Sequence, residues 1–142
     1  MGYSIIKIYF NGILARMEYF SLTAWSKTYP LHQYEDIKNS ILGKKYTLSL
    51  AFVGPKKAQA LNMKHRNKNY VPNVLSFPLT ENTGEVCITL AIAKKEASKF
   101  DMSFEGYVGF LFVHALLHLK GYDHGDTMDK AERKFCTKYN LK

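Results

Sequence analysis

The chain has 142 residues, 46% of them hydrophobic, so it can bury one core and is expected to form a single domain over residues 1–142. Its 20 lysines and arginines outnumber 12 acidic residues, which gives a net charge of +8. This charge is compatible with a polyanionic partner, but many basic domains bind none. Cys87 and Cys136 show no C-x-x-C spacing, which excludes a cysteine zinc knuckle, and the absence of an export or membrane-anchoring signal predicts a cytoplasmic protein with reduced thiols.

The first half of the chain is predicted to alternate strands and helices. Residues 3–10 are rich in β-branched and aromatic side chains and end at an Asn-Gly turn signal, which indicates a strand. A helix is expected next, because apolar residues recur at roughly helical spacing before Pro30. These residues are Leu14, Met17, Leu22 and Trp25. Residues 46–53 alternate and stop at Gly-Pro, so they predict a second strand, with a basic helix after it.

A polar loop and a hairpin are predicted in the middle of the chain. Residues 66–73 are polar and contain a proline, which favours a loop. Two short strands should follow, residues 74–77 closed by Pro78 and residues 85–89, joined by the polar turn at residues 80–83.

Three helices are predicted in the last third. Alanines and lysines favour a helix over residues 90–100, and residues 126–141 form a charged amphipathic pattern typical of a covering helix. Between them, residues 103–120 are apolar on almost every side, as in a buried core helix. Ser103 is suited to its N-cap, and Gly121 to the left-handed residue that ends it.

Three histidines in and after the buried helix form a candidate metal site. His114 and His118 are four residues apart, so both imidazoles leave the same helix face. Gly121 then lets the chain turn back and bring His124 to the same place. The alternative is two histidines satisfied in the core and a third in solvent, but burying two unpaired imidazoles is costly. Three imidazoles leave a coordination position for water, as in catalytic zinc sites.

The histidine spacing is also that of the metzincin proteases, with glycine three residues after the second histidine. Those enzymes need a glutamate directly after the first histidine as general base, and here that residue is Ala115. Efficient peptide hydrolysis is therefore not expected, although a degenerate peptidase remains an alternative.

Two blocks of sequence resemble the YbeY family of bacterial endoribonucleases that mature ribosomal RNA. The first is H-A-L-L-H-L-K-G-Y-D-H at residues 114–124, and the second is L-N-x-x-x-R at residues 61–66 with N-V-L-S-F-P at residues 73–78. Weaker agreement lies in residues 84–88 and in Met128 with Glu132. The resemblance implies a small α/β domain with a mixed four-stranded sheet and the histidine helix packed behind it. It also implies a zinc ion, single-stranded RNA as substrate, and a small-subunit ribosomal protein and an assembly GTPase as partners.

The chain departs from the family pattern at several positions. The family usually has glycine in place of Ala115, an acidic residue in place of Asn69, Pro-Thr in place of Val71-Pro72, and Asp in place of Glu85. These departures affect the contacts of the loop more than the three histidines.

Further residues are candidates for an RNA site. Arg66 could be a solvated surface arginine, but the resemblance at residues 61–66 favours a functional role for it. Arg66 can pair with phosphate oxygens through two N–H groups, so it is expected to stabilise the transition state or anchor the substrate. Further substrate-binding candidates, each of which can instead be solvated or locally paired, are Lys64, Lys68, Asn73 and Ser76. Asp123 is a candidate to orient a histidine.

The resulting prediction is a metal-dependent, single-strand-specific endoribonuclease. No general base can be named, and hydrolysis and attack by the RNA's own 2′-hydroxyl both remain open. A rival from another class is a non-catalytic RNA-binding assembly factor with a structural metal.

Overall fold

A computed structural model describes residues 6–7 and 16–142 of the chain. Two short strands, β1 and β2, pair antiparallel, and four further strands form the main sheet. The strands are β1 (Ile6–Lys7), β2 (Arg16–Met17), β3 (Phe20–Ala24), β4 (Thr47–Val53), β5 (Val74–Thr80) and β6 (Thr83–Thr89). The helices are α1 (Tyr34–Leu42), α2 (Pro55–Arg66), α3 (Leu90–Glu96), the 3-10 helix η1 (Ala97–Phe100), α4 (Phe104–Lys120) and α5 (Asp126–Lys138).

The main sheet has the strand order β3-β4-β6-β5 and is mixed. β3 and β6 both run parallel to the central strand β4, whereas β5 pairs antiparallel with β6. Leu22, Leu50 and Val86 lie side by side across three strands, and the last two are fully buried. This arrangement confirms the predicted α/β class and four-stranded mixed sheet.

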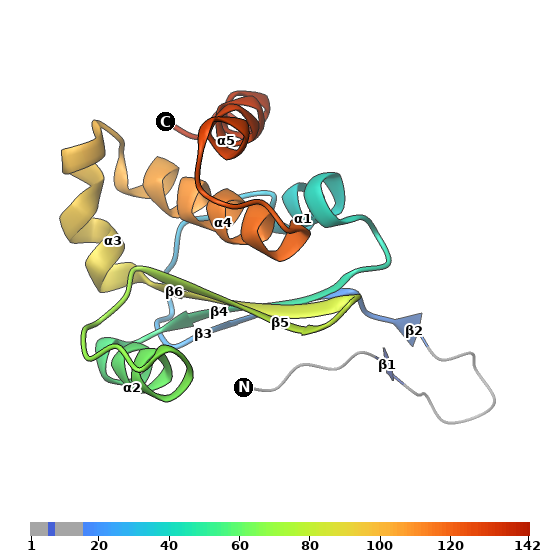
Figure 1. Ribbon diagram of the computed structural model, residues 1–142, viewed down its shortest axis with the longest axis horizontal. Coiled ribbons are helices and arrows are strands. Elements are labelled where there is room, and N and C mark those ends of the chain that lie inside the picture. Colours follow the sequence, from blue (N-terminus) through green and yellow to red (C-terminus); the bar gives the residue numbers. More distant parts are fainter. Residues whose placement is uncertain (1–5, 8–15) are drawn as a thin grey trace.

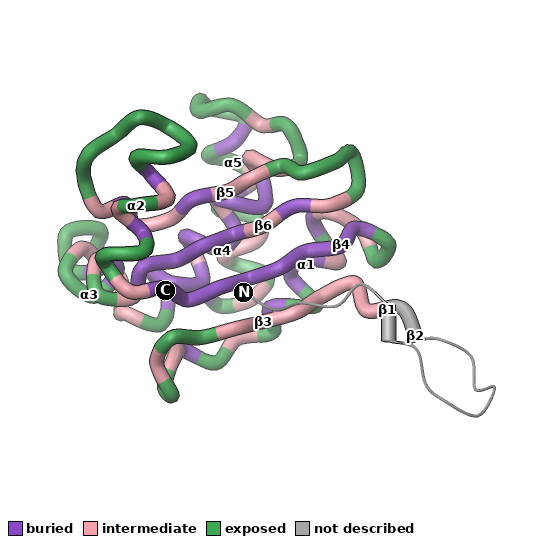
Figure 2. Tube along the Cα trace, turned by 90° about the horizontal axis from the view of Figure 1, so that it is seen from below, coloured by how far each residue is buried: buried purple, intermediate pink, exposed green. Residues whose placement is uncertain are grey.

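The core lies between this sheet and helix α4. α1 and α4 cover one face of the sheet, α5 packs on α4, and α2 lies against the opposite face (Figure 1). The central strands β4 and β6 are buried along most of their length, while the edge strand β3 is only half-buried (Figure 2). The prediction of a buried histidine helix is confirmed, because Val108, Phe112 and Leu116 are fully buried.

The predicted N-terminal helix is wrong where the structure describes that part of the chain. Leu22 lies in strand β3, Trp25 follows it, and Met17 belongs to β2, while Leu14 is outside the described residues. The apolar residues of β3 recur every second position, with Phe20 and Leu22 packed on the core, and parallel pairing with β4 favours the strand. Of the strand predicted at residues 3–10, the structure describes only Ile6–Lys7, which form β1.

Helix α1 was not predicted, although its sequence carries a signal. Tyr34, Ile37 and Ile41 follow the helical spacing of three and four residues and pack into the core. No side chain caps its first turn. Gln33 is not a preferred N-cap residue, so the main start signal is missing, although Glu35 and Asp36 lie in the first turn.

Several other boundaries differ from the prediction. β5 continues through Pro78 to Thr80, because it is an edge strand, where a missing backbone donor is tolerated, and its register shifts between these two residues. The helix predicted over residues 90–100 is an α-helix that tightens into η1 at Ala97. β6 begins at Thr83 instead of residue 85, which shortens the polar turn to residues 81–82, and α5 ends at Lys138 instead of residue 141. The loop and the helices at α2 and α4 agree with the prediction.

In the described residues, no single helix combines the length and apolar character needed to cross a membrane. Residues 90–100 and 104–120 meet that test only when they are joined, and they are bent by 103° at the break.

Candidate metal centre and its cleft

Helix α4 holds the first two histidines on a fixed frame. The Oγ atom of Ser103 accepts a hydrogen bond from the backbone N–H of Gly106 at 3.0 Å, which confirms the predicted N-cap. The helix ends at Gly121, whose φ of 109° is the left-handed conformation expected there. His114 and His118 are half-buried on one face of this helix. Both side chains therefore start from a backbone that packing and capping keep in place.

The turn after α4 brings the third histidine to the other two. The N–H of Gly121 bonds to the carbonyl oxygen of His118, and the chain then reverses. The Nε2 atom of His118 lies 3.1 Å from the Nε2 atom of His114 and 3.1 Å from that of His124. The three potential ligand atoms all lie within 4.8 Å of one another. The geometry can hold one metal ion.

Contacts on the far side of two rings fix which nitrogen faces the centre. The Nδ1 atom of His114 lies 2.7 Å from Oε2 of Glu132, and the Nδ1 atom of His118 lies 3.0 Å from the carbonyl oxygen of Tyr122. A carbonyl and a carboxylate accept hydrogen bonds, so each Nδ1 carries the proton and each Nε2 presents a lone pair.

Lone pairs that face each other at 3.1 Å repel unless a cation lies between them. Nitrogen atoms bound tetrahedrally to zinc at 2.0–2.1 Å lie about 3.3–3.4 Å apart. The two Nε2 separations of 3.1 Å are close to this value. Burial and the neighbouring His114 lower the pKa of His118, which favours the neutral imidazole that a metal requires. The donor set therefore fits a divalent metal ion.

The histidines open onto a cleft of about 320 Å³ between α4, β5 and the end of α2. The cleft is lined by Arg66, Asn73, Val74, Leu75, Ser76, His114, Ala115, His118 and His124. None of these described residues is acidic, so the cleft wall offers no carboxylate as a general base. Arg66 is the cation that shares the cleft with the histidines.

A buried amide holds Arg66 in this position. Nη1 of Arg66 donates to Oδ1 of Asn62 at 3.1 Å and to the hydroxyl of Tyr70 at 3.3 Å. Asn62 is fully buried and also donates from Nδ2 to the carbonyl oxygen of Tyr70 at 3.0 Å, which ties the following loop to α2. The hydrogen bond and charge of Arg66 lower the pKa of the exposed Tyr70. Asn62 thus holds both the guanidinium and the loop that follows α2.

The remaining candidates divide into those that reach the cleft and those that do not. Ser76 and Asn73 line it, but Nδ2 of Asn73 donates to Oε1 of Glu96 at 3.0 Å and its Oδ1 accepts from the Val74 N–H at 2.7 Å. The side chain of Asn73 is therefore engaged in hydrogen bonds within the protein. Lys64 and Lys68 are exposed beside the end of α2 and do not line the cleft.

The carboxylate that orients a histidine is Glu132, not the candidate Asp123. Asp123 is exposed, and no hydrogen bond or ion pair joins it to a histidine within the described part of the chain. Glu132 lies on α5, is only 8% exposed and points at the ring of His114. In the sequence, Glu132 falls at helical spacing from the apolar residues Met128 and Phe135, and a carboxylate on the apolar side of a helix is the signal that could have found it.

Replacing Glu132 with alanine is expected to weaken metal binding by about 10- to 100-fold, because His114 loses the acceptor that orients its ring. The measurement is a metal titration against a competing chelator. Asp129→Ala, at an exposed carboxylate on the same helix, is the control and should bind metal normally. Equal affinity in the two variants would show that Glu132 has no such role.

Comparison with known proteins places this geometry in a family. The family model for Endoribonuclease YbeY matches residues 21–140, which include every residue of the cleft. The chain belongs to the YbeY family. The short strands β1 and β2 precede the matched residues.

Several curated YbeY proteins are similar to this chain. The Endoribonuclease YbeY of Alkaliphilus metalliredigens is 40% identical over 100 residues, covering 63% of this chain and 64% of that protein. The protein of the same name from Mycoplasma mycoides is 43% identical, and the match covers 58% of this chain and 57% of that protein. The protein from Campylobacter jejuni is 37% identical, and the match covers 72% of this chain and 81% of that protein. The match thus spans less than two thirds of the length of two of these YbeY relatives.

A solved structure supports the fold. The solution structure of TM1509 from Thermotoga maritima matches with a TM-score of 0.59, covering 82% of this chain and 85% of that one at 24% identity. At this identity the likeness concerns the arrangement of helices and strands.

Proposed function

We propose that this chain is a metal-dependent endoribonuclease that cuts single-stranded RNA in the cleft between the three histidines and Arg66. The observation that carries the proposal is the orientation of the histidines, because two Nδ1 atoms are hydrogen-bonded outward and leave the Nε2 lone pairs facing one another. Family membership and the net charge of +8 favour RNA over a neutral substrate.

The proposed ion is zinc, held by His114, His118 and His124. Neutral nitrogen ligands keep its double charge, so when bound it supplies Lewis acidity, lowering the pKa of a water toward about 7 and offsetting charge on phosphoryl oxygens. Neither cysteine belongs to the histidine cluster in the described residues, so a fourth position remains for water or substrate. Elemental analysis of the purified protein tests the identity of the ion.

Arg66 is proposed to bind the scissile phosphate. Within the described part of the chain its contacts to Asn62 and Tyr70 use Nη1, which leaves the Nη2 and Nε donors for two phosphate oxygens. Charge that builds on these oxygens in the transition state would then meet a guanidinium already held in place.

The experiment compares substrates and metal states. The zinc-loaded protein is incubated with single-stranded RNA, with double-stranded RNA and with a peptide mixture, each with and without a chelator. We expect cleavage of the single-stranded RNA alone, abolished by the chelator and restored by zinc. Peptide cleavage would instead indicate a degenerate peptidase. RNA binding that survives chelation without any cleavage would indicate an assembly factor.

The ends of the RNA products distinguish the two chemical routes. A 2′,3′-cyclic phosphate indicates attack by the neighbouring 2′-hydroxyl, whereas a linear phosphate from the first turnover indicates water as the nucleophile. For the biological setting, we propose a cytoplasmic role in ribosomal RNA maturation, with the small ribosomal subunit and an assembly GTPase as partners, on the basis of the family resemblance.

A further inference from the structure

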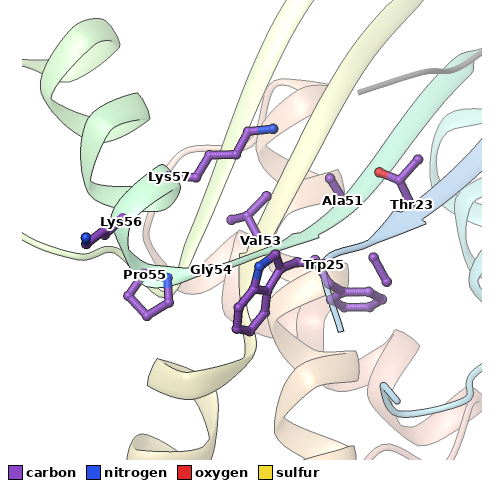
Figure 3. Close-up of a pocket in the computed structure, with 10 residues that line it drawn as sticks. Thr23, Trp25, Ala51, Val53, Gly54, Pro55, Lys56 and Lys57 are labelled. Atoms are coloured by element: carbon purple, nitrogen blue, oxygen red, sulfur yellow. The ribbon is translucent and has the colours of Figure 1, made fainter. Parts of the chain in front are cut away.

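A second pocket, of about 530 Å³, lies where β3 and β4 end and α2 begins (Figure 3). It is distinct from the histidine cleft and shares no lining residue with it. Its floor is apolar, and Ala51 and Val53 belong to the small core between the sheet and α2. Trp25, Lys56 and Lys57 also line the pocket.

Trp25 is a largely exposed aromatic residue at the pocket. Its backbone N–H bonds to the carbonyl oxygen of Phe52 at 2.9 Å, so the residue is anchored at the end of β3. Its indole rests against Gly54, where an added Cβ would lie 3.6 Å from two ring atoms, yet the residue is 78% exposed. An anchored and exposed indole offers a face on which a nucleobase can stack, and such stacking tolerates any base.

Both charged residues that line the pocket are basic. Lys56 and Lys57 line it, and the chain has no aspartate or glutamate between Gly54 and Thr80. The basic residues of this segment, apart from its histidine, are Lys56, Lys57, Lys64, Arg66 and Lys68. A surface with this charge attracts a polyanion and disfavours a basic or neutral apolar peptide.

Helix α2 connects the pocket to the cleft. It begins at the pocket with Pro55 and ends in the cleft with Arg66, a rise of about 16 Å. Lys56 and Lys64 are eight residues apart, so they lie on the same exposed side of the helix, about 12 Å from each other. One extended strand can therefore contact the pocket, this helix side and the cleft in order.

We propose that the pocket at Trp25 is a second binding site for the single-stranded RNA substrate, where one base stacks on the indole and the adjacent phosphates pair with Lys56 and Lys57. The RNA then follows α2 to Arg66. This inference rests on the proposed function for the identity of the substrate, and it adds a contact remote from the reacting phosphate.

Trp25 reports on its own occupancy, because it is the one tryptophan of the chain. The probe is an RNA dodecanucleotide of alternating adenosine and cytidine, titrated in the presence of a chelator so that it is not cut. We expect quenching of the tryptophan fluorescence at saturation, and no quenching by a ribose-phosphate strand of the same length that lacks bases. Binding of the RNA without quenching would overturn the proposal.

Matched variants test the energetics. Trp25→Ala should weaken binding of the dodecanucleotide by roughly 5- to 150-fold, and Trp25→Phe should restore most of it. Leu31→Ala, at another exposed apolar residue, is the control. Replacing Lys56 and Lys57 with glutamine should reduce the slope of log affinity against log salt by about 1.4. Unchanged affinity and slope in variants with normal circular dichroism would contradict the site.

Cleavage kinetics separate this inference from the proposed function. With long RNA, Trp25→Ala should raise KM and leave kcat nearly unchanged, because the contact is remote from the chemistry. With a dinucleotide too short to reach the pocket, the variant should match the unaltered chain. If the chain cuts RNA but shows neither fluorescence quenching nor a KM effect, the pocket proposal alone fails. If it binds RNA with quenching but never cuts it, the proposed function alone fails.

Discussion

Replacing His118 with alanine is expected to abolish both metal binding and RNA cleavage. His118 is the central ligand of the three, since its Nε2 atom lies 3.1 Å from each of the other two. Two histidines that remain cannot enclose an ion in the same way. A catalytic metal provides several kcal/mol of transition-state stabilisation, so its loss should reduce the cleavage rate by about three orders of magnitude or more.

The measurements are metal content by elemental analysis and the initial rate of single-stranded RNA cleavage. His65→Ala is the matched control, because His65 is exposed and its ring packs beside Phe77, outside the metal cluster. The control should keep its metal. Thermal unfolding of both variants separates metal loss from a folding defect. A folded His118→Ala protein with full metal content would refute the three-histidine centre, and cleavage that persists in it would indicate a contaminating nuclease.

Local patterns explain why the metal site was predictable from the sequence. His114 and His118 depend only on the repeat of one helix, and His124 depends on a turn whose glycine is visible in the sequence. The uniformly apolar α4 likewise predicts its own burial, because a helix without a polar side has no surface to present to water.

Contacts between distant segments explain what the sequence did not reveal. Glu132 meets His114 because α5 folds back over α4, 18 residues further along the chain. β3 is a strand because β4 offers it a parallel partner, and parallel pairing depends on the whole sheet rather than on local spacing. The role of Asn62 likewise depends on the loop that returns to it at Tyr70. Each of these features requires a second segment whose position no local pattern specifies.

Arg66→Ala is expected to lower kcat/KM for single-stranded RNA by about 100- to 1,000-fold while metal content stays unchanged. Arg66 is exposed, but its guanidinium shares the cleft with the histidines and bonds to the buried Asn62, so its removal deletes a donor that the fold positions. Deleting one preorganised donor of this kind typically has an effect of this size. Arg133→Ala, at an exposed arginine on α5, is the control and should behave like the unaltered chain.

The kinetic form of the defect in the Arg66 variants distinguishes the two roles that the sequence left open. A fall in kcat with unchanged KM assigns Arg66 to the transition state, whereas a rise in KM alone assigns it to substrate anchoring. Arg66→Lys keeps the charge but loses the planar pair of donors, so it should recover only a small part of the activity if both phosphate oxygens are bound at once. Full activity in Arg66→Ala, with metal still present, would mean that the ion alone stabilises the phosphate and that the contact with Asn62 serves only the fold.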